Sequence, residues 1–253
     1  MAFGNNLQYL RKMHRGMTQE ELAEKMDVSR QTISKWEMGS AYPEMEKALL
    51  LCKLFACSLD ELMRKNMQQE DAAYQNMHIE EIPAFHYIRY VVISCDPEGD
   101  ALHHIREWAA MNGIVEPNII GWDFPILSQE QINVYHMHGY SAACILPEGY
   151  DFTCTEIQQQ KAQKYAVLTI TDPFNQPFVS IPNAFKTLLR YIEVNNLTHN
   201  MTKDIIDNFE RVYEKDGMTF MDIHIAIESN LTSQVLYKTK DRTLLQSSFI
   251  SYD

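Results

Sequence analysis

The sequence lacks the long hydrophobic segments that membrane helices and export signals require. None of its apolar runs approaches the roughly 18 to 20 residues that a spanning helix needs. The first residues, MAFGNNLQYLRKMHRG, contain neither an apolar stretch nor the small-residue cleavage site of a signal peptide. We therefore expect no membrane association and a cytoplasmic location.

Cysteine patterns and cofactor motifs are also missing. The five cysteines are odd in number and form no CxxC pair, so we expect reduced thiols that pack as small hydrophobic side chains. The sequence contains no GxGxxG, P-loop, GxSxG or HExxH motif. His136 and His138 would share one face of a strand, but two ligands are too few for a zinc site. We expect no metal and no cofactor.

Positive charge is scarce outside the first quarter of the chain. The net charge is −12, yet residues 1–65 hold ten Lys and Arg against nine Asp and Glu. The remaining residues hold twelve against twenty-five. Because an acidic body repels phosphate, any contact with nucleic acid must come from the N-terminal segment.

Helical periodicity dominates residues 3–63 and predicts several short helices. Thr18 followed three residues later by Glu21 is a capping-box pattern at the start of one helix. Ser29 is a favourable N-cap for the next helix, which would begin after the short turn at Asp27 and Val28.

The segment SRQTISKWEMG, residues 29–39, is unusually polar for a packed helix. At 100° per residue, Ile33 and Trp36 fall on one side and would anchor the helix to a small core. Such a polar face is ordinarily solvated, but Arg and Gln can also form paired hydrogen bonds with guanine and adenine edges in the major groove. The side chains on this outer face are Arg30, Gln31, Ser34, Lys35 and Met38.

The order of these residues resembles the helix-turn-helix domain of the XRE (Cro-like) regulators. TQEELA, VSRQTISKWE.G and SLDELM stand at family spacing, and the match covers roughly residues 5–64. The resemblance implies five helices, with 29–38 as the recognition helix in the major groove, and a homodimer on near-palindromic double-stranded DNA. It implies base contacts from Arg30, Gln31 and Lys35, and Ser34 on the same face is a further DNA-binding candidate. It also implies a phosphate contact from Gln19 and backbone contacts from Arg11, Ser40 and Tyr42.

The C-terminal body contains an internal repeat. Residues 84–113 and 162–196 each hold a β-rich run around a tyrosine, an Asp-Pro pair, a connecting loop and an amphipathic helix. The second loop is about seven residues longer. Further strand candidates, such as NIIGWDFP and NFERVY, follow each helix. We therefore predict an α+β domain of two β-α-β-β repeats related by a pseudo-two-fold axis.

This arrangement resembles the GyrI-like effector-binding domain of multidrug-sensing regulators. The segments EIPAFHYIRY, KYAVLTI and MDIHIAIE carry the resemblance, which covers roughly residues 77–228. The expected domain boundaries are 1–64 for the helix-turn-helix domain, 65–77 for a linker, 78–228 for the GyrI-like domain and 229–253 for an extension.

The resemblance implies an aromatic pocket with an acid between the repeats. It assigns the acid to Glu210, and the repeat suggests Asp123 at the related position; each could instead be a solvated strand residue. A bulky cation would bury its apolar body against rings and meet the acid with its charge. Core packing is an equal alternative for each candidate wall residue. These are Trp122, Phe124, Tyr135, Tyr140, Phe178 and Tyr213.

Together these features predict a one-component DNA-binding transcriptional regulator that senses a small, lipophilic and cationic effector and is not an enzyme. One alternative is a small-molecule hydrolase in which Glu210 is the general base, assisted by Tyr165 or Tyr213. Another is a degenerate pocket that serves only dimerisation or protein docking.

Overall fold

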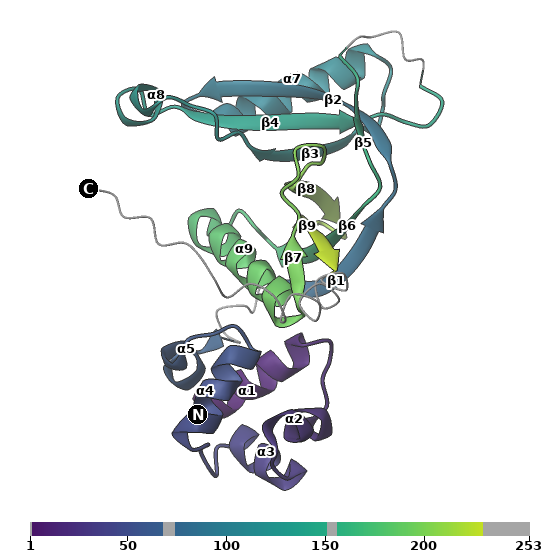
Figure 1. Ribbon diagram of the computed structural model, residues 1–253. Helices are drawn as coiled ribbons and strands as arrows, with labels where there is room; N and C mark the ends of the chain where they lie inside the picture. The colour runs from purple at the N-terminus through teal and green to yellow at the C-terminus, as the bar shows by residue number, and fades with distance from the viewer. Residues whose placement is uncertain (1, 68–73, 151–155, 230–253) are drawn as a thin grey trace, which may run out of the picture.

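The computed structural model of the protein describes residues 2–67, 74–150 and 156–229. A helical N-terminal domain is followed by a curled antiparallel sheet that carries helices (Figure 1). The predicted fold class, all-α and then α+β, is confirmed. Within the described ranges no helix combines the length and hydropathy needed to cross a bilayer.

Five helices form in residues 2–64, as the sequence predicts. Each of the five contributes a fully buried apolar side chain to one core; these are Leu7, Leu22, Ile33, Leu51 and Leu62. The bounds are α1 (Ala2–Met13), α2 (Gln19–Met26), α3 (Arg30–Glu37), α4 (Met45–Leu54) and α5 (Leu59–Arg64).

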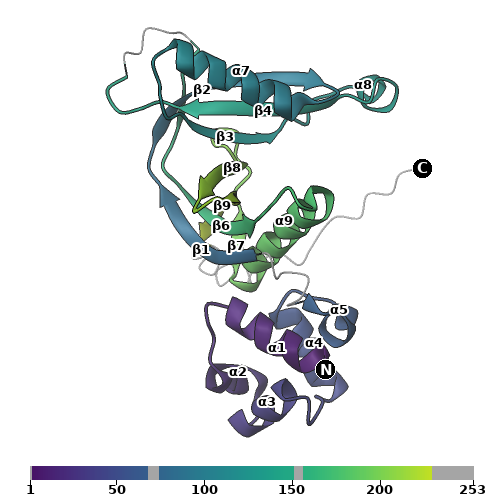
Figure 2. The same ribbon diagram turned by 180° about the vertical axis from the view of Figure 1, so that it is seen from behind.

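Local capping residues set the starts of α2, α3 and α5. Thr18 and Glu21 form the predicted reciprocal capping box, and the Ser29 hydroxyl accepts a hydrogen bond from the Thr32 amide. Ser58 and Glu61 form a second capping box at α5. The recognition-helix candidate α3 lies at the end of the molecule opposite the sheet in both views (Figures 1 and 2).

The second domain contains nine described strands and three helices. Eight strands follow the order β1-β6-β9-β8-β3-β4-β2-β5, and β7 pairs with β9. The strands are β1 (Tyr74–Ile82), β2 (Phe85–Ser94), β3 (Asn118–Asp123), β4 (His138–Ile145), β5 (Gln158–Gln160), β6 (Gln163–Thr171), β7 (Leu197–His199), β8 (Asn208–Lys215) and β9 (Met218–Ser229). The helices are α7 (Pro97–Met111), α8 (Gln129–Asn133) and α9 (Pro177–Val194).

The strand order shows the predicted repeat. Strands β2, β3 and β4 with α7 form one half, and β6, β8 and β9 with α9 form the other. The strand preceding each half crosses over, because β1 pairs with β6 and β5 pairs with β2. The two halves meet at β3 and β8, whose register contains the pair Gly121–Glu210.

Three details differ from the sequence-based expectation. The Met67 side chain packs in the N-terminal core and Tyr74 already begins β1, so both ends of the expected linker 65–77 are structured. The first repeat has no connecting loop, because α7 begins directly at Pro97. Helix α8 was not predicted. Of the expected extension 229–253, only Ser229, the end of β9, lies inside the described residues.

Candidate functional site

The polar face of α3 forms a continuous surface at the tip of the N-terminal domain. Ile33 and Trp36 are buried in the core, as the 100° spacing predicted. The residues on the opposite side line one shallow, open cleft of about 290 Å³, together with a residue from the start of α2. They are Gln19, Arg30, Gln31, Ser34, Lys35 and Met38.

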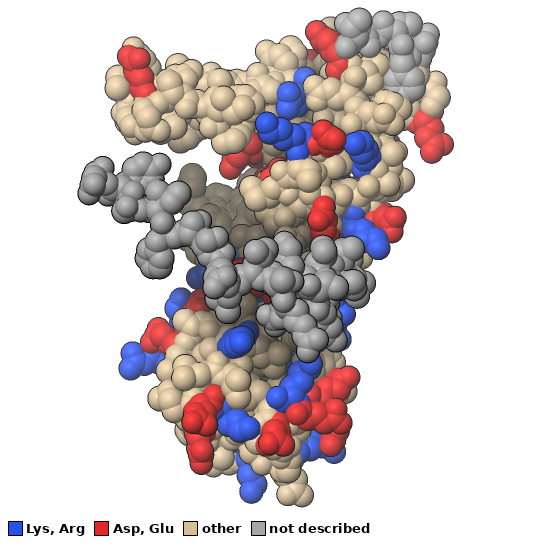
Figure 3. All heavy atoms as spheres, viewed as in Figure 1, with Lys and Arg blue, Asp and Glu red and all other residues tan. Residues whose placement is uncertain are grey.

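Charges of both signs surround this surface. On the face in view, Lys and Arg side chains alternate with Asp and Glu over the N-terminal domain (Figure 3). The Arg30 guanidinium lies 4.0 Å from the Glu20 carboxylate, and both side chains are about two-thirds exposed. Such an exposed pair is weak and leaves Arg30 available to other partners.

Beneath the surface, Glu37 organises the contact between α1, α2 and α3. Its carboxylate accepts hydrogen bonds from the Arg11 Nε at 2.6 Å and from the Gln19 Nε2 at 2.8 Å. Arg11 also donates to the Met17 carbonyl. Gln19 is thereby held next to the α3 face.

The structure corrects the expectation that Arg11 contacts the DNA backbone. Its side chain is 10% exposed and its guanidinium is engaged by Glu37, which is itself buried. Arg11 is a buried ion-pair residue that joins α1 to α3. Ser40 and Tyr42 are at least partly exposed beyond the end of α3, where the Ser40 hydroxyl donates to the Lys35 carbonyl.

The second candidate site lies on the sheet face that carries both α7 and α9. In the register, Ala142, Gly121, Glu210, Ile223 and Leu168 form one row across neighbouring strands. Ala142 packs in the α7 core, whereas Ile223 and Leu168 pack in the α9 core. Because paired residues share a face, Glu210 lies at the middle of this row, between the two helices and where the two halves meet.

Three carboxyl groups converge there. Burial, together with the negative charges of Glu98 and Asp123, raises the pKa of Glu210 to about 8. Burial and the same kind of repulsion, from Asp123 and Asp96, raise the pKa of Glu98. Glu98 was not predicted from the sequence; it joins the site because the N-terminal turn of α7 is placed over the end of β3.

Tyr140 and Gly121 complete this site. A Cβ at Gly121 would overlap the Tyr140 hydroxyl, so the tyrosine ring lies directly over the glycine. Burial, followed by the charge of Glu210, raises the pKa of Tyr140. The residue opposite Glu210 is therefore Gly121, and Asp123 lies two positions further along the same face.

Trp122 points to the other face of the sheet. It lies edge-to-face with Tyr87 at 6.5 Å and lines a separate cleft of about 510 Å³ with Lys203 and Asp207. A strand alternates its side chains, so Trp122 and Asp123 cannot both face Glu210. The structure separates Trp122 from the Glu210 site.

The remaining aromatic candidates are spread over the domain. Phe178 and Tyr135 are exposed, at 94% and 54%, at the start of α9 and after α8. Phe124 is half-buried beside Gly139 at the end of β3. Tyr213 stacks on Phe220 with ring centroids 5.6 Å apart. Among the predicted aromatics, Tyr140 is the one that the structure brings next to Glu210.

A cleft of about 540 Å³ adjoins the Glu210 site where β3 and β8 diverge. The residues that line it include Arg106 and Ala110 of α7, Ile119 of β3, and Arg211, Val212 and the predicted wall residue Tyr213 of β8. Val212 lies on the same face of β8 as Glu210, two residues further along. The acid therefore lies beside an open cleft whose lining mixes polar and apolar side chains.

Comparison with known proteins defines the class of the N-terminal domain. The family model described as "Helix-turn-helix" matches residues 7–62. An uncharacterized HTH-type transcriptional regulator, MJ0272 of Methanocaldococcus jannaschii, is 40% identical over 58 residues, which are 23% of this chain and 86% of that protein. The chain therefore belongs to the helix-turn-helix family of transcriptional regulators.

A second relative is much longer than the matched segment. The HTH-type transcriptional activator BcrR of Enterococcus faecalis is 48% identical over 63 residues, which are 25% of this chain and 30% of BcrR. The chain thus spans less than a third of that relative.

Solved structures resemble more of the chain, but weakly. The EcmrR C-terminal domain covers 62% of this chain and 98% of its own, at 13% identity and a TM-score of 0.41. SAV2435 bound to tetraphenylphosphonium covers 61% of this chain and 94% of its own, at 11% identity and a TM-score of 0.37.

Proposed function

We propose that this protein is a one-component transcriptional regulator in which α3 reads operator DNA and the sheet domain senses a small molecule. The observation that carries the proposal is the division of α3 into a buried side, Ile33 and Trp36, and an open polar side with Arg30, Gln31 and Lys35. Arg and Gln present the paired donors and acceptors that distinguish base edges in the major groove. A homodimer would place two such helices on a near-palindromic site.

Selection from a randomised duplex pool tests this proposal. The wild-type chain should enrich a near-palindromic motif, and the variant carrying Arg30→Ala and Gln31→Ala should enrich none, because each good base contact contributes about 1–3 kcal/mol of discrimination. Arg64→Ala removes an exposed charge on α5 and serves as the control. Equal enrichment by the wild type and the double variant would exclude α3 as the reading helix.

For the sheet domain, we propose a lipophilic cation as the effector, bound at Glu210. The support is physical: a carboxyl group kept protonated by burial and by Glu98 and Asp123 gains a charge partner when a cation enters. The Tyr140 ring and the apolar side chains Ile119 and Val212 of the adjoining cleft offer surface for an apolar body. The GyrI-like resemblance of this domain implies the same kind of pocket, in which aromatic rings and an acid bind a bulky cation.

Thermal-shift measurements with tetraphenylphosphonium and neutral triphenylphosphine oxide test the effector proposal. The cation should raise the melting temperature more than the neutral compound. The difference should grow as the pH rises toward about 8, because the cation favours the ionised form of Glu210. It should disappear in Glu210→Gln. An equal response to both compounds at every pH would exclude Glu210 as the charge partner.

A further inference from the structure

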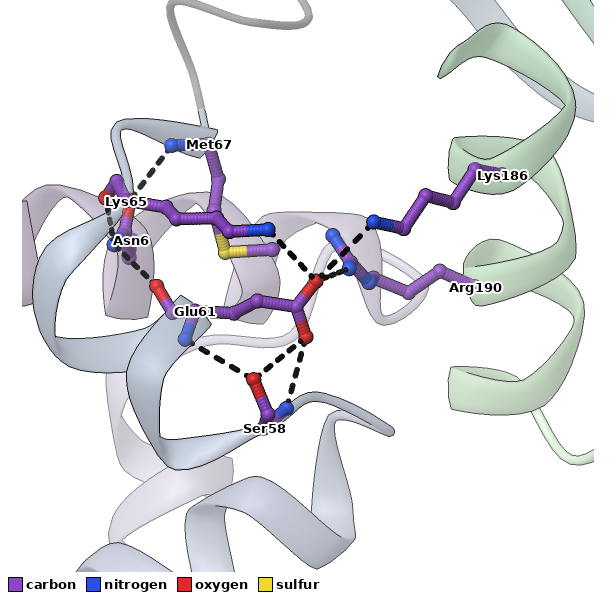
Figure 4. A network of polar contacts seen from close by, with 7 residues as sticks. All are labelled: Asn6, Ser58, Glu61, Lys65, Met67, Lys186 and Arg190. Carbon is purple, nitrogen blue, oxygen red and sulfur yellow. Dashed lines mark hydrogen bonds and ion pairs between the residues drawn. The ribbon is translucent and has the colours of Figure 1, made fainter. Parts of the chain in front are cut away.

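The outer face of α9 contacts the N-terminal domain through a shielded ion pair. The Arg190 Nη2 donates to the Glu61 Oε1 at 2.7 Å, and the Lys186 Nζ lies 3.5 Å from the same oxygen (Figure 4). The Arg190 and Glu61 side chains are 11% and 15% exposed. Water screens such a pair much less than it screens a surface pair.

Apolar and backbone contacts extend this interface to the end of α9. Val194 is buried within the core cluster of the N-terminal domain. The Asn195 side chain donates to the Met13 carbonyl at 3.4 Å, and the Arg15 guanidinium donates to the Asn195 carbonyl at 3.1 Å. The last turns of α9 therefore contact both α1 and α5.

The first repeat provides an internal comparison for this face. Asn112 and Asn195 cap α7 and α9 in the same way, each donating its side-chain amide to the carbonyl four residues earlier at 2.8 Å. Counting back from these caps, Lys186, Arg190 and Val194 correspond to His103, Glu107 and Met111 of α7.

The equivalent faces of the two helices differ in exposure: the face on α7 is exposed, and the face on α9 is covered by the N-terminal domain. On α7, His103 and Glu107 form an exposed pair within the helix, and Met111 is 80% exposed. On α9, the same positions carry two cations directed at Glu61 and a valine that is 2% exposed. The docking contacts are thus specific to the second repeat.

We propose that α9 is the coupling element of the regulator: Arg190 and Glu61 hold the helix-turn-helix domain and the second repeat as one rigid body. The first repeat joins this body at β3 and β8, where Glu210 lies. A ligand at that junction then acts on the N-terminal domain through α9, a step that rests on the proposed effector site. Arg190 and Glu61 are positioning residues and contact neither DNA nor ligand.

The two carboxylate oxygens of Glu61 have different partners, one within α5 and one on α9. The Oε2 accepts hydrogen bonds at 3.0 Å from the Ser58 amide and hydroxyl, which caps α5, while the Oε1 faces Arg190. Because glutamine also completes a capping box, Glu61→Gln removes the charge and keeps the cap. Arg190→Glu introduces at this position the residue that the first repeat carries at 107.

Hydrogen exchange of the full-length chain tests the proposal without a ligand. Arg190→Ala, Arg190→Glu and Glu61→Gln should each accelerate amide exchange by about tenfold or more in α5 and the last turns of α9, with β2 and β4 unchanged. The control is Arg64→Ala, whose guanidinium pairs with Asp60 within α5 at 3.3 Å. Wild-type exchange in all three variants would overturn the proposal.

Adding tetraphenylphosphonium separates coupling from a merely structural role. In the wild type, the cation should change exchange in the sheet domain and also in α1 and α5; in Arg190→Ala, the change should stop at the sheet domain. A cation response that reaches α5 equally in both proteins would overturn the coupling role. If the cation alters nothing in the wild-type sheet domain, the effector proposal fails, and the ligand-free comparison alone decides whether α9 holds the two parts together.

Discussion

Glu210 concentrates the electrostatics of the sheet domain in one carboxyl group. It lies on the helix-bearing face, at the pair that joins the two halves, and Glu98 and Asp123 add negative charge to the penalty of burial. The raised pKa of Glu210, about 8, favours its protonated form at neutral pH. A proton and a cationic ligand are alternative ways of neutralising the negative charge of the Glu210 carboxylate.

This protonation makes the stability of the fold depend on pH. The pKa of Glu210 rises from an ordinary 4.5 in the unfolded chain to about 8 in the folded protein. The contribution of Glu210 to the free energy of unfolding is therefore fully present below pH 4.5 and is lost as the pH rises through 8. We expect Glu210→Gln to match the wild type near pH 4.5. Near pH 8 it should be more stable by on the order of 3–5 kcal/mol.

Urea unfolding at both pH values measures this effect. Glu214→Gln, on the same strand but exposed, is the matched control and should follow the wild type throughout. A Glu210→Gln variant that is equally stable or less stable near pH 8 would show that the carboxyl is ionised in the folded protein.

Residue spacing was enough to predict the α3 surface but not the Glu210 site. Ile33 and Trp36 carry a 100° pattern that fixes which side of the helix is buried, and the structure places Arg30, Gln31, Ser34 and Lys35 on the open side. In a strand, by contrast, a shift of one residue exchanges the faces. The sequence therefore could not decide whether Trp122 or Asp123 shares a face with Glu210.

At the scale of elements, the buried pair between Arg11 and Glu37 joins three helices. Arg11 lies on α1, Glu37 ends α3, and Gln19 of α2 donates to the same carboxylate. The sequence shows Arg11 only as a basic residue near the end of a helix, and the family resemblance implied a contact with the DNA backbone. Its burial depends on how α1 crosses α3, and Gly4 permits that crossing because a Cβ there would collide with the Glu37 carbonyl.

Removing the arginine should destabilise this arrangement strongly. In Arg11→Ala, the buried Glu37 carboxylate loses its partner, which typically costs about 3–5 kcal/mol. Circular dichroism during urea unfolding should show an earlier loss of helix in Arg11→Ala, whereas Lys12→Ala, exposed on the same helix, should resemble the wild type. Full stability of Arg11→Ala with loss of DNA binding would restore Arg11 to the DNA surface.

The repeat was visible in the sequence because each half must build the same β-α-β-β unit, with its own helix covering its own strands. The crossed pairing of β1 with β6 and β5 with β2 was not visible, because these strands are paired across the repeats rather than within them. The docking of α9 on α5 is likewise a contact between segments more than 120 residues apart, as Arg190 and Glu61 are 129 positions from each other.

At the scale of the whole molecule, one chain carries two candidate sites and a helix that connects them. DNA would contact α3 at one end, a cation would contact Glu210 in the sheet, and α9 lies between them (Figure 1). Control of DNA binding requires that the cation bind the DNA-competent and DNA-incompetent arrangements with different affinities.

The most direct test measures the affinity of the full-length chain for its enriched duplex by fluorescence anisotropy, with and without saturating tetraphenylphosphonium. We predict a change of about 5- to 150-fold in the dissociation constant, the range typical of coupling between two sites. An unchanged dissociation constant, in a protein whose melting temperature the cation does raise, would contradict the account.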